Sequence, residues 1–165
     1  TDTIKGTNLK LNFNHPVKEL IWTCKDVSAS ATTLEATPRI VGNASTTTWK
    51  LVLNGHDRFA EKPTEYFAGY QVAKYHKGTP LYLDIDQGGA TSGHHCATNT
   101  IAVYSFALKP EEHQPSGTCN FSRIDSAQLI NKNHHDDTDN TFRIYAVNYN
   151  ILRIMSGMGG LAYSN

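Results

Sequence analysis

Cysteine is scarce in this sequence. The 165 residues include only Cys24, Cys96 and Cys119, an odd number at wide spacing. A disulfide scaffold needs an even and denser set, and a thiolate zinc site shows paired spacings such as C-x-x-C. Neither pattern is present. We therefore predict reduced thiols in a cytosolic compartment.

An excess of charge and a long apolar run are also missing. Lys and Arg total 15, and Asp and Glu total 15. Proteins that bind nucleic acid mainly through phosphates carry a basic excess, so direct nucleic-acid binding is not expected. No stretch approaches the ~20 apolar residues of a membrane-spanning helix, so membrane insertion is not expected either. Residues 1–3 show neither an initiator Met nor a signal-peptide core, and we expect the chain to begin inside a longer protein.

Residues that favour β structure are abundant, with 18 Thr, 8 Tyr and 6 Phe against 2 Met. Apolar and polar residues alternate with period two in short segments separated by turn residues. These segments are residues 9–13, 19–24, 49–53, 81–85, 101–108, 121–130 (one strand or two) and 142–155. They predict an all-β fold of about eight strands, which fits a jelly-roll sandwich. Periodicity alone leaves cupin-like and lectin-like sandwiches open.

One segment departs from this alternation. Tyr66, Tyr70 and Ala73 fall at helical spacing, with Phe67 beside them, after Pro63. They predict a short helix within residues 61–77. Asn54-Gly55 predicts a tight turn, and the glycines of residues 157–160 are expected to close the last strand. Polar segments at residues 25–47, 86–99 and 131–140 are predicted loops and candidate contact surfaces.

Several polar clusters were considered as sites of chemistry. The sequence His94-His95-Cys96 offers metal-ligating side chains, but neighbours in an extended chain point in opposite directions. Residues 134–139 (HHDDTD) have the alternate acids of a calcium loop without its Gly and closing Glu. Asp84 and Asp86 form a carboxylate pair, but no basic or metal-ligating residue is expected beside them. No nucleophile motif and no phosphate-binding loop motif occurs in the sequence. We predict no enzyme activity and no catalytic, cofactor-binding or metal-ligating residue.

Two asparagines, Asn43 and Asn120, match the N-glycosylation pattern. The pattern is short, and its use requires passage through a secretory pathway, which the cysteines argue against. Whether either asparagine carries a sugar stays open at this point.

Three segments together resemble one protein family. The longest is residues 104–125, YSFALKPEEHQPSGTCNFSRID, interpreted as a strand, a turn with two prolines and a glycine, and a second strand. The second is residues 53–59, LNGHDRF, with Tyr66-Phe67, and the third is residues 148–164, NYNILRIMSGMGGLAYS. In this order they resemble the major capsid proteins of nucleocytoplasmic large DNA viruses, of the algal-virus and giant-virus type. Within the longest segment, Arg123 and Asp125 are expected on one strand face, where they could fix register.

The resemblance implies a structural protein. Its fold would be a double jelly roll, with residues 1–165 forming the second jelly roll of a longer chain. Three chains would form a pseudo-hexagonal capsomer, and capsomers would tile an icosahedral shell assembled in the host cytoplasm. The expected partners are further copies of the chain as a homotrimer, neighbouring capsomers and minor capsid proteins.

Two other functions remain as alternatives. A carbohydrate-binding sandwich would use an exposed aromatic platform, drawn from Trp49, Tyr66, Tyr70 or Tyr75. A metal-dependent cupin enzyme would need the histidines at residues 94–95 to converge with another His and an acid. Bound sugar would favour the first alternative and stoichiometric metal the second.

Overall fold

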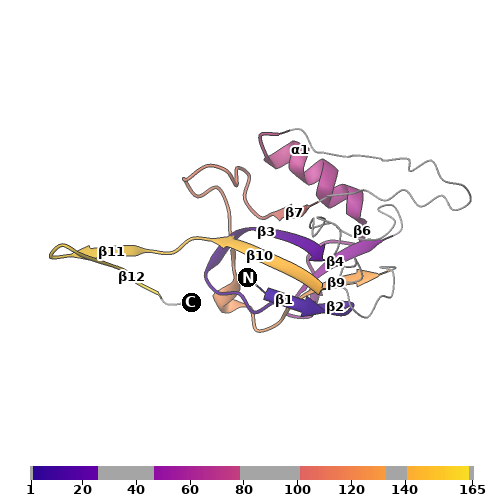
Figure 1. The fold of residues 1–165 in the computed structure, drawn as a ribbon, viewed down its shortest axis with the longest axis horizontal. Coiled ribbons are helices and arrows are strands. Elements are labelled where there is room, and N and C mark those ends of the chain that lie inside the picture. Colours follow the sequence, from indigo (N-terminus) through magenta and orange to yellow (C-terminus); the bar gives the residue numbers. More distant parts are fainter. Residues whose placement is uncertain (1, 26–46, 79–100, 133–140, 164–165) are drawn as a thin grey trace, which may run out of the picture.

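The computed structural model describes residues 2–25, 47–78, 101–132 and 141–163 (Figure 1). Within these ranges two β-sheets face each other, one short helix lies beside them, and a separate hairpin projects from one end. No helix of the described residues is long and apolar enough to cross a membrane. The predicted strand at residues 81–85 and most of the three predicted loops lie outside the described residues.

The first sheet has the order β1-β10-β3-β7 and is antiparallel throughout. Strands β7 and β8 both pair with the same edge of β3, and β8 lies nearer to the start of β3. They therefore occupy one strand position in the sheet. The strands are β1 (Asp2–Lys5), β3 (Pro16–Lys25), β7 (Ala102–Ser105), β8 (Cys119–Asn120) and β10 (Thr141–Asn148).

The second sheet has the order β2-β9-β4, and two short strands pair with the remaining edge of β4. The strands are β2 (Asn8–Lys10), β4 (Thr48–Leu53), β5 (His56–Asp57), β6 (Lys62–Pro63) and β9 (Ala127–Lys132). Each sheet of the described residues therefore has four strand positions, the arrangement of a jelly roll. The predicted all-β jelly-roll sandwich is confirmed.

Large aromatic side chains fill the space between the sheets. The ring centroids of Trp22 on β3 and Trp49 on β4 lie 5.5 Å apart, and Phe142 on β10 lies 5.6 Å from Trp49. All three are fully buried or nearly so, together with the alternating aliphatic residues of the same strands. The predicted inward faces of residues 9–13, 19–24 and 49–53 are confirmed by the buried residues Leu9, Leu11, Leu20, Trp22, Trp49 and Leu51.

The predicted helix is present, and the face that it buries includes a polar residue. A π-helical turn (η1, Tyr66–Tyr70) runs directly into α1 (Gln71–Tyr75). Its buried residues are Phe67 and Gln71, whereas Tyr70 is 52% exposed. Phe67 packs 5.1 Å from Trp22, and the Gln71 side chain accepts a hydrogen bond from the backbone N–H of Ser105 at the edge of β7. The helix thus covers the edge of the first sheet.

The structure corrects three predicted elements. Residues 121–123 form a 3-10 helix (η2, Phe121–Arg123) in place of a strand, because the Asn120 side chain accepts a hydrogen bond from the Ser122 N–H. Arg123 and Asp125 therefore do not share a strand face. Asn131 is a buried residue of β9 rather than a loop residue, and its amide donates to the Gly6 carbonyl. The alternation of residues 142–155 is divided into β10 and β11 (Leu152–Met155).

The two predicted turns are confirmed. Asn54 and Gly55 both have positive φ, as a two-residue hairpin turn requires, and they connect β4 to β5. In the proline-bounded turn of residues 109–117, Gly117 has φ +139°, and a Cβ added there would lie 2.9 Å from the Phe106 carbonyl oxygen. Glycine is required at this position because the two backbone segments approach so closely.

A buried carboxylate joins β3 to the helix. Glu19 Oε2 lies 3.2 Å from His76 Nε2, and His76 Nδ1 lies 3.3 Å from Glu111 Oε1. The approach of Glu19 to His76 is not an aligned hydrogen bond, since neither atom has a hydrogen-bond partner among the described residues. Burial raises the pKa of Glu19, although His76 and Lys18 oppose this shift.

We expect Glu19→Gln to stabilise the chain at neutral pH. A carboxyl whose pKa is raised by folding stabilises the fold below its unfolded pKa, and this contribution is lost as the pH rises through the folded pKa. The amide is neutral throughout, so the variant should exceed wild type in unfolding free energy at pH 7.5 and match it near pH 4. Urea unfolding at several pH values measures the difference. A variant that is less stable at pH 7.5 would show that the contact with His76 outweighs the cost of burial.

Candidate assembly surface

The projecting hairpin is formed by β11 (Leu152–Met155) and β12 (Met158–Leu161), and we call residues 151–163 the arm (Figure 1). Ser156 and Gly157 make its two-residue turn with φ of 50° and 80°. This is the geometry that two-residue hairpins prefer, because it matches the twist of the strands. The predicted closing role of residues 157–160 holds for Gly157, which lies in the turn that ends β11, whereas Gly159 and Gly160 lie within a second strand.

The pairing register gives the arm two different faces. Leu152 pairs with Leu161 and Ile154 with Gly159, so these four residues share one face. Ile154 Cγ1 lies 4.0 Å from the position of a Cβ at Gly159, so the isoleucine lies over the glycine. We call this face, with its three aliphatic side chains, the ridge.

The opposite face carries the remaining pairs, Arg153 with Gly160 and Met155 with Met158. A shallow hollow on the arm is lined by residues of both faces, namely Arg153, Met155, Met158, Gly159, Gly160 and Leu161. Two consecutive glycines leave the backbone bare, and methionine side chains adapt to irregular neighbours.

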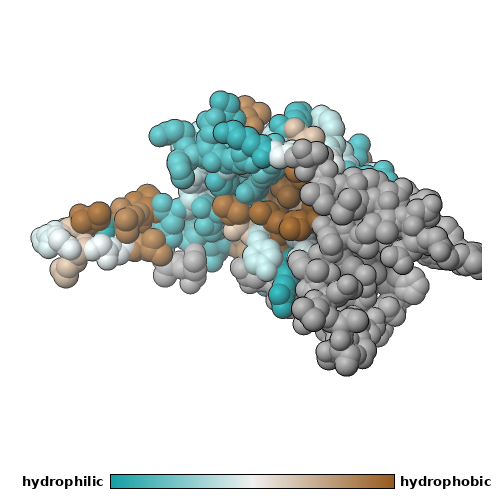
Figure 2. Space-filling view, turned by 45° about the horizontal axis from the view of Figure 1, so that its top comes forward, coloured by the Kyte–Doolittle hydropathy of each residue, from teal (hydrophilic) through white to brown (hydrophobic). Residues whose placement is uncertain are grey.

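Apolar exposure is concentrated on the arm. Figure 2 shows hydrophobic residues along the projecting hairpin. Among the described residues eleven large apolar side chains are exposed, and seven of them lie within residues 151–163, each 54–75% exposed. The seven are Ile151, Leu152, Ile154, Met155, Met158, Leu161 and Tyr163. A concentration of exposed apolar side chains makes the arm a candidate contact surface.

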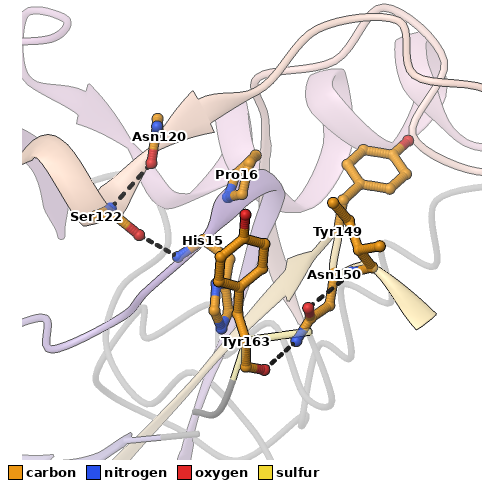
Figure 3. Close-up of a pocket in the computed structure, with 8 residues that line it drawn as sticks. His15, Pro16, Asn120, Ser122, Tyr149, Asn150 and Tyr163 are labelled. Carbon is orange, nitrogen blue, oxygen red and sulfur yellow. Dashed lines mark hydrogen bonds between the residues drawn. The ribbon is translucent and has the colours of Figure 1, made fainter. Parts of the chain in front are cut away.

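Hydrogen bonds fix the base of the arm to the sandwich (Figure 3). The Tyr149 N–H donates to the Pro16 carbonyl at 2.9 Å, and the Asn150 amide donates to the Tyr163 carbonyl at 2.9 Å. The His15 N–H donates to Ser122 Oγ at 2.9 Å, which holds His15 in its positive-φ conformation. The base is therefore held by bonds from β3, β8–η2 and the arm itself.

A pocket of about 300 Å³ lies at this base, lined by His15, Pro16, Asn120, Ser122, Tyr149, Asn150, Ile151 and Tyr163. The lining is mainly apolar, and the ring of His15 lies 6.3 Å from that of Tyr163. The pocket can accommodate an apolar group of a neighbouring molecule.

The metal-ligand candidates proposed from the sequence cannot be placed in the described structure. His94, His95, Cys96, the segment of residues 134–139, Asp84 and Asp86 all lie outside the described residues. Within the part that is described, no group of three or more His, Cys, Asp or Glu side chains could hold a metal ion. The prediction of no metal site remains a prediction.

The aromatic platform of the carbohydrate alternative is not formed as expected. Trp49 is completely buried, and its indole N–H donates to Thr64 Oγ1 at 2.9 Å. Tyr66 and Tyr70 stack on each other at 5.3 Å, and Tyr75 is half-buried. Only Tyr70 among the four is exposed, and Lys74 Nζ lies 5.5 Å from its ring centroid. A sugar would find one partly covered ring rather than a platform.

The remaining candidate residues lie as follows. Cys119 on β8 is an unpaired, half-buried thiol whose pKa is raised by burial. Cys24 lies in β3, and Cys96 is outside the described residues. Asn120 is exposed at the rim of the basal pocket, and Asn43 is not described. The predicted reduced state of the three thiols remains a prediction.

Comparison with known proteins decides the family. The family model described as large eukaryotic DNA virus major capsid protein matches residues 2–85 and 91–160. The chain belongs to this family. It is a family of structural capsid proteins rather than of enzymes, and the predicted family resemblance is confirmed.

Individual capsid proteins show the same relationship. The major capsid protein of Pyramimonas orientalis virus is 49% identical over 99% of this chain, and that of Paramecium bursaria Chlorella virus 1 is 38% identical over 99%. The capsid chain in the quasi-atomic model of the PBCV-1 virus capsid superimposes with a TM-score of 0.66 at 31% identity, over 99% of this chain. The chain spans 40%, 44% and 46% of the lengths of these three proteins, respectively.

Sequence reasoning missed the arm. The available signal was the Ser156-Gly157 dipeptide between two methionines, which is a hairpin pattern. The sequence pattern does not indicate that the arm is exposed, because its alternating aliphatic residues have the same pattern as a strand that packs in a core.

Proposed function

We propose that this chain is the second jelly roll of a double jelly-roll major capsid protein and that it builds the wall of an icosahedral virion. In this proposal three copies form a pseudo-hexagonal capsomer, and capsomers tile the shell. The observation that carries the proposal is the apolar arm, which projects from the sandwich of a chain that belongs to this family. A projecting apolar surface is suited to binding another protein.

The lengths of the relatives support the domain assignment. The chain spans less than half of the three capsid proteins compared above, so their remaining length could hold a second sandwich of similar size. Residues 1–165 would then be one jelly roll and the remaining part of the longer protein the other.

The surroundings of the capsid chain follow from this role. Its partners would be copies of itself, neighbouring capsomers and minor capsid proteins. It would be located in the virion, after assembly in the host cytoplasm. The equal numbers of basic and acidic residues support close tiling, because a large charge of one sign would make identical subunits repel each other.

The mass of the purified chain tests self-association. We expect light scattering to give three times the 18.3 kDa of one chain at high concentration, with hexagon-like particles or sheets in negative-stain images. A mass of one chain at every concentration would contradict association through this jelly roll.

A further inference from the structure

We infer that Glu19, His76 and Glu111 form a proton-binding cluster, which fastens the end of the helix and the turn of residues 109–117 to β3 and opens as the pH rises. We call this cluster the latch. Glu19 lies on β3, His76 directly follows α1, and Glu111 belongs to the turn. The inference concerns the sandwich itself and does not depend on the proposed function.

The contacts among the three elements are direct. His76 Nε2 lies 3.2 Å from Glu19 Oε2, and His76 Nδ1 lies 3.3 Å from Glu111 Oε1. Glu111 Oε1 also accepts a hydrogen bond of 2.7 Å from the Lys77 backbone N–H. The His76 N–H donates to the Val72 carbonyl at 2.9 Å, which keeps the imidazole in the last helical turn. A change at His76 therefore affects β3, the helix and the turn together.

Two buried atoms of the latch require a proton between them. Glu19 Oε2 and His76 Nε2 are both buried without a hydrogen-bond partner among the described residues. An ionised carboxylate only accepts hydrogen bonds, and so does a ring nitrogen that lacks its hydrogen. If neither group carried a proton, two buried acceptors would face each other, which is costly. One proton on either atom allows a hydrogen bond after a small rotation of the ring.

The second ring nitrogen defines how many protons the latch holds. A neutral imidazole carries one N–H, so it can donate to one carboxylate but not to two. Either the imidazolium donates to both Glu19 and Glu111, or a protonated Glu19 donates to His76 Nε2 while Nδ1–H faces Glu111. Both arrangements hold one proton more than a neutral ring between two carboxylates. The proton therefore belongs to the cluster as a unit.

The surroundings of Glu19 favour uptake of this proton. Burial raises the pKa of the Glu19 carboxyl, and Glu111 adds to this shift, whereas His76 and Lys18 oppose it. The residues that pair with Glu19 on β10 and β7 are uncharged, and on the turn Lys109 and Glu112 form an ion pair of 3.2 Å. The other titratable side chains beside the latch in sequence are the exposed Lys74, Lys77 and His113 and the half-buried Tyr75.

Loss of the proton weakens the latch as the pH rises. A carboxyl whose pKa is raised by folding stabilises the fold below its ordinary value of 4.5, and this contribution is lost as the pH rises through the folded value. Opening is local, because residues 106–107 stay bonded to the Lys18 carbonyl on β3, and Phe67 and Gln71 still hold the first part of the helix. We expect the helix end and the turn to loosen while both sheets stay folded.

Hydrogen exchange of the whole chain, followed by NMR, tests the latch. The readouts are the amides of His76 and Lys77, which bond to Val72 and Glu111. After correction for the intrinsic pH dependence of exchange, we expect their protection to fall at least about tenfold between pH 5.5 and 7.5. An opening that releases one proton changes by up to about tenfold per pH unit. Amides of β10 should keep their protection. Equal protection at both pH values, or a loss on acidification, would overturn the inference.

Variants assign the proton to the latch. His76→Gln has no titratable ring, so the protection of residues 76 and 77 should no longer depend on pH. His113→Gln is the matched control, because His113 is an exposed histidine of the same turn, and it should behave as wild type. A pH dependence that persists in H76Q or disappears in H113Q would show that the proton binds elsewhere.

Glu19→Gln gives a second test, which remains if H76Q fails to fold. The amide can donate to a neutral ring while the other ring nitrogen donates to Glu111, so the variant needs no extra proton. We expect it to lose most of the pH dependence of protection at residues 76 and 77. A pH dependence as steep as that of wild type would contradict the part of Glu19 in the latch.

Discussion

Replacing Trp22 by alanine is expected to cost about 3–5 kcal/mol of unfolding free energy, which is a large part of the ~5–15 kcal/mol that a domain has. Trp22 is completely buried and contacts aromatic rings from both sides of the core, with centroids 5.5 Å away at Trp49 and 5.1 Å away at Phe67. The cavity would lie where β3, β4 and the helix meet. Urea unfolding followed by tryptophan fluorescence from Trp49 measures the loss.

Substitution by phenylalanine separates packing from hydrogen bonding. Trp22 Nε1 has no hydrogen-bond partner among the described residues, whereas Trp49 Nε1 donates to Thr64 Oγ1. We therefore expect Trp22→Phe to be milder than Trp49→Phe by about 1 kcal/mol, the net value of one hydrogen bond. Equal losses in the two variants would show that ring volume alone decides stability at both positions.

Replacing Phe67 by alanine is the second large effect, and we expect a loss of about 3–5 kcal/mol. Phe67 is the completely buried residue of η1, and its ring lies 5.4 Å from that of Phe59 as well as near Trp22. Without it the helix keeps only polar attachments to the sheet among the described residues, the Gln71 contact to β7 and the His76 contact to Glu19 of β3. Hydrogen exchange should therefore increase in residues 66–75 more than in β3 or β10.

Tyr70→Ala is the control for this experiment. Tyr70 belongs to the same helical turn but is 52% exposed, and its ring contacts only Tyr66 and Lys74 among the described partners. We expect a change below about 1 kcal/mol. A loss of stability for Tyr70→Ala as large as that for Phe67→Ala would contradict the role of Phe67 as the main attachment of the helix.

The sequence predicted this helix but not its orientation. Apolar spacing selects the face with the most aromatic residues, whereas the structure buries Gln71, a polar residue. Burial of Gln71 is tolerated because its carbonyl oxygen accepts a hydrogen bond from the Ser105 N–H at the edge of the sheet. A hydrogen bond between residues 34 positions apart leaves no trace in a periodic pattern.

The presence of most strands could be predicted from the alternation of apolar residues, but their boundaries could be predicted less well. Alternation placed Leu20, Trp22 and Leu51 in the core correctly, because one face of each strand packs against the opposite sheet. Alternation also continued through residues 149–151, where the chain leaves the sandwich. There Asn150 bonds to the Ile151 N–H and to the Tyr163 carbonyl, which ends β10 and begins the arm. Such local hydrogen bonds by asparagine compete with strand pairing. They can end a strand without changing the alternation of apolar residues, so the alternation does not reveal them.

The candidate site could be predicted only in part. The family resemblance indicated a protein that acts through surfaces, and the structure gives the arm as the most apolar of the described surfaces. The proposed contact loops at residues 25–47, 86–99 and 131–140 are mostly outside the described residues. Exposure depends on where a strand lies relative to the core, and this information is absent from the spacing of Leu152, Ile154 and Leu161.

The glycines of β12 have a consequence for the stability of the arm itself. Glycine loses more backbone entropy than any other residue when it is fixed in a strand, so Gly159 and Gly160 weaken the pairing of β11 with β12. A two-stranded hairpin is only marginally stable in water without further contacts. A protein that covered the exposed aliphatic residues of the arm would therefore also hold the two strands together.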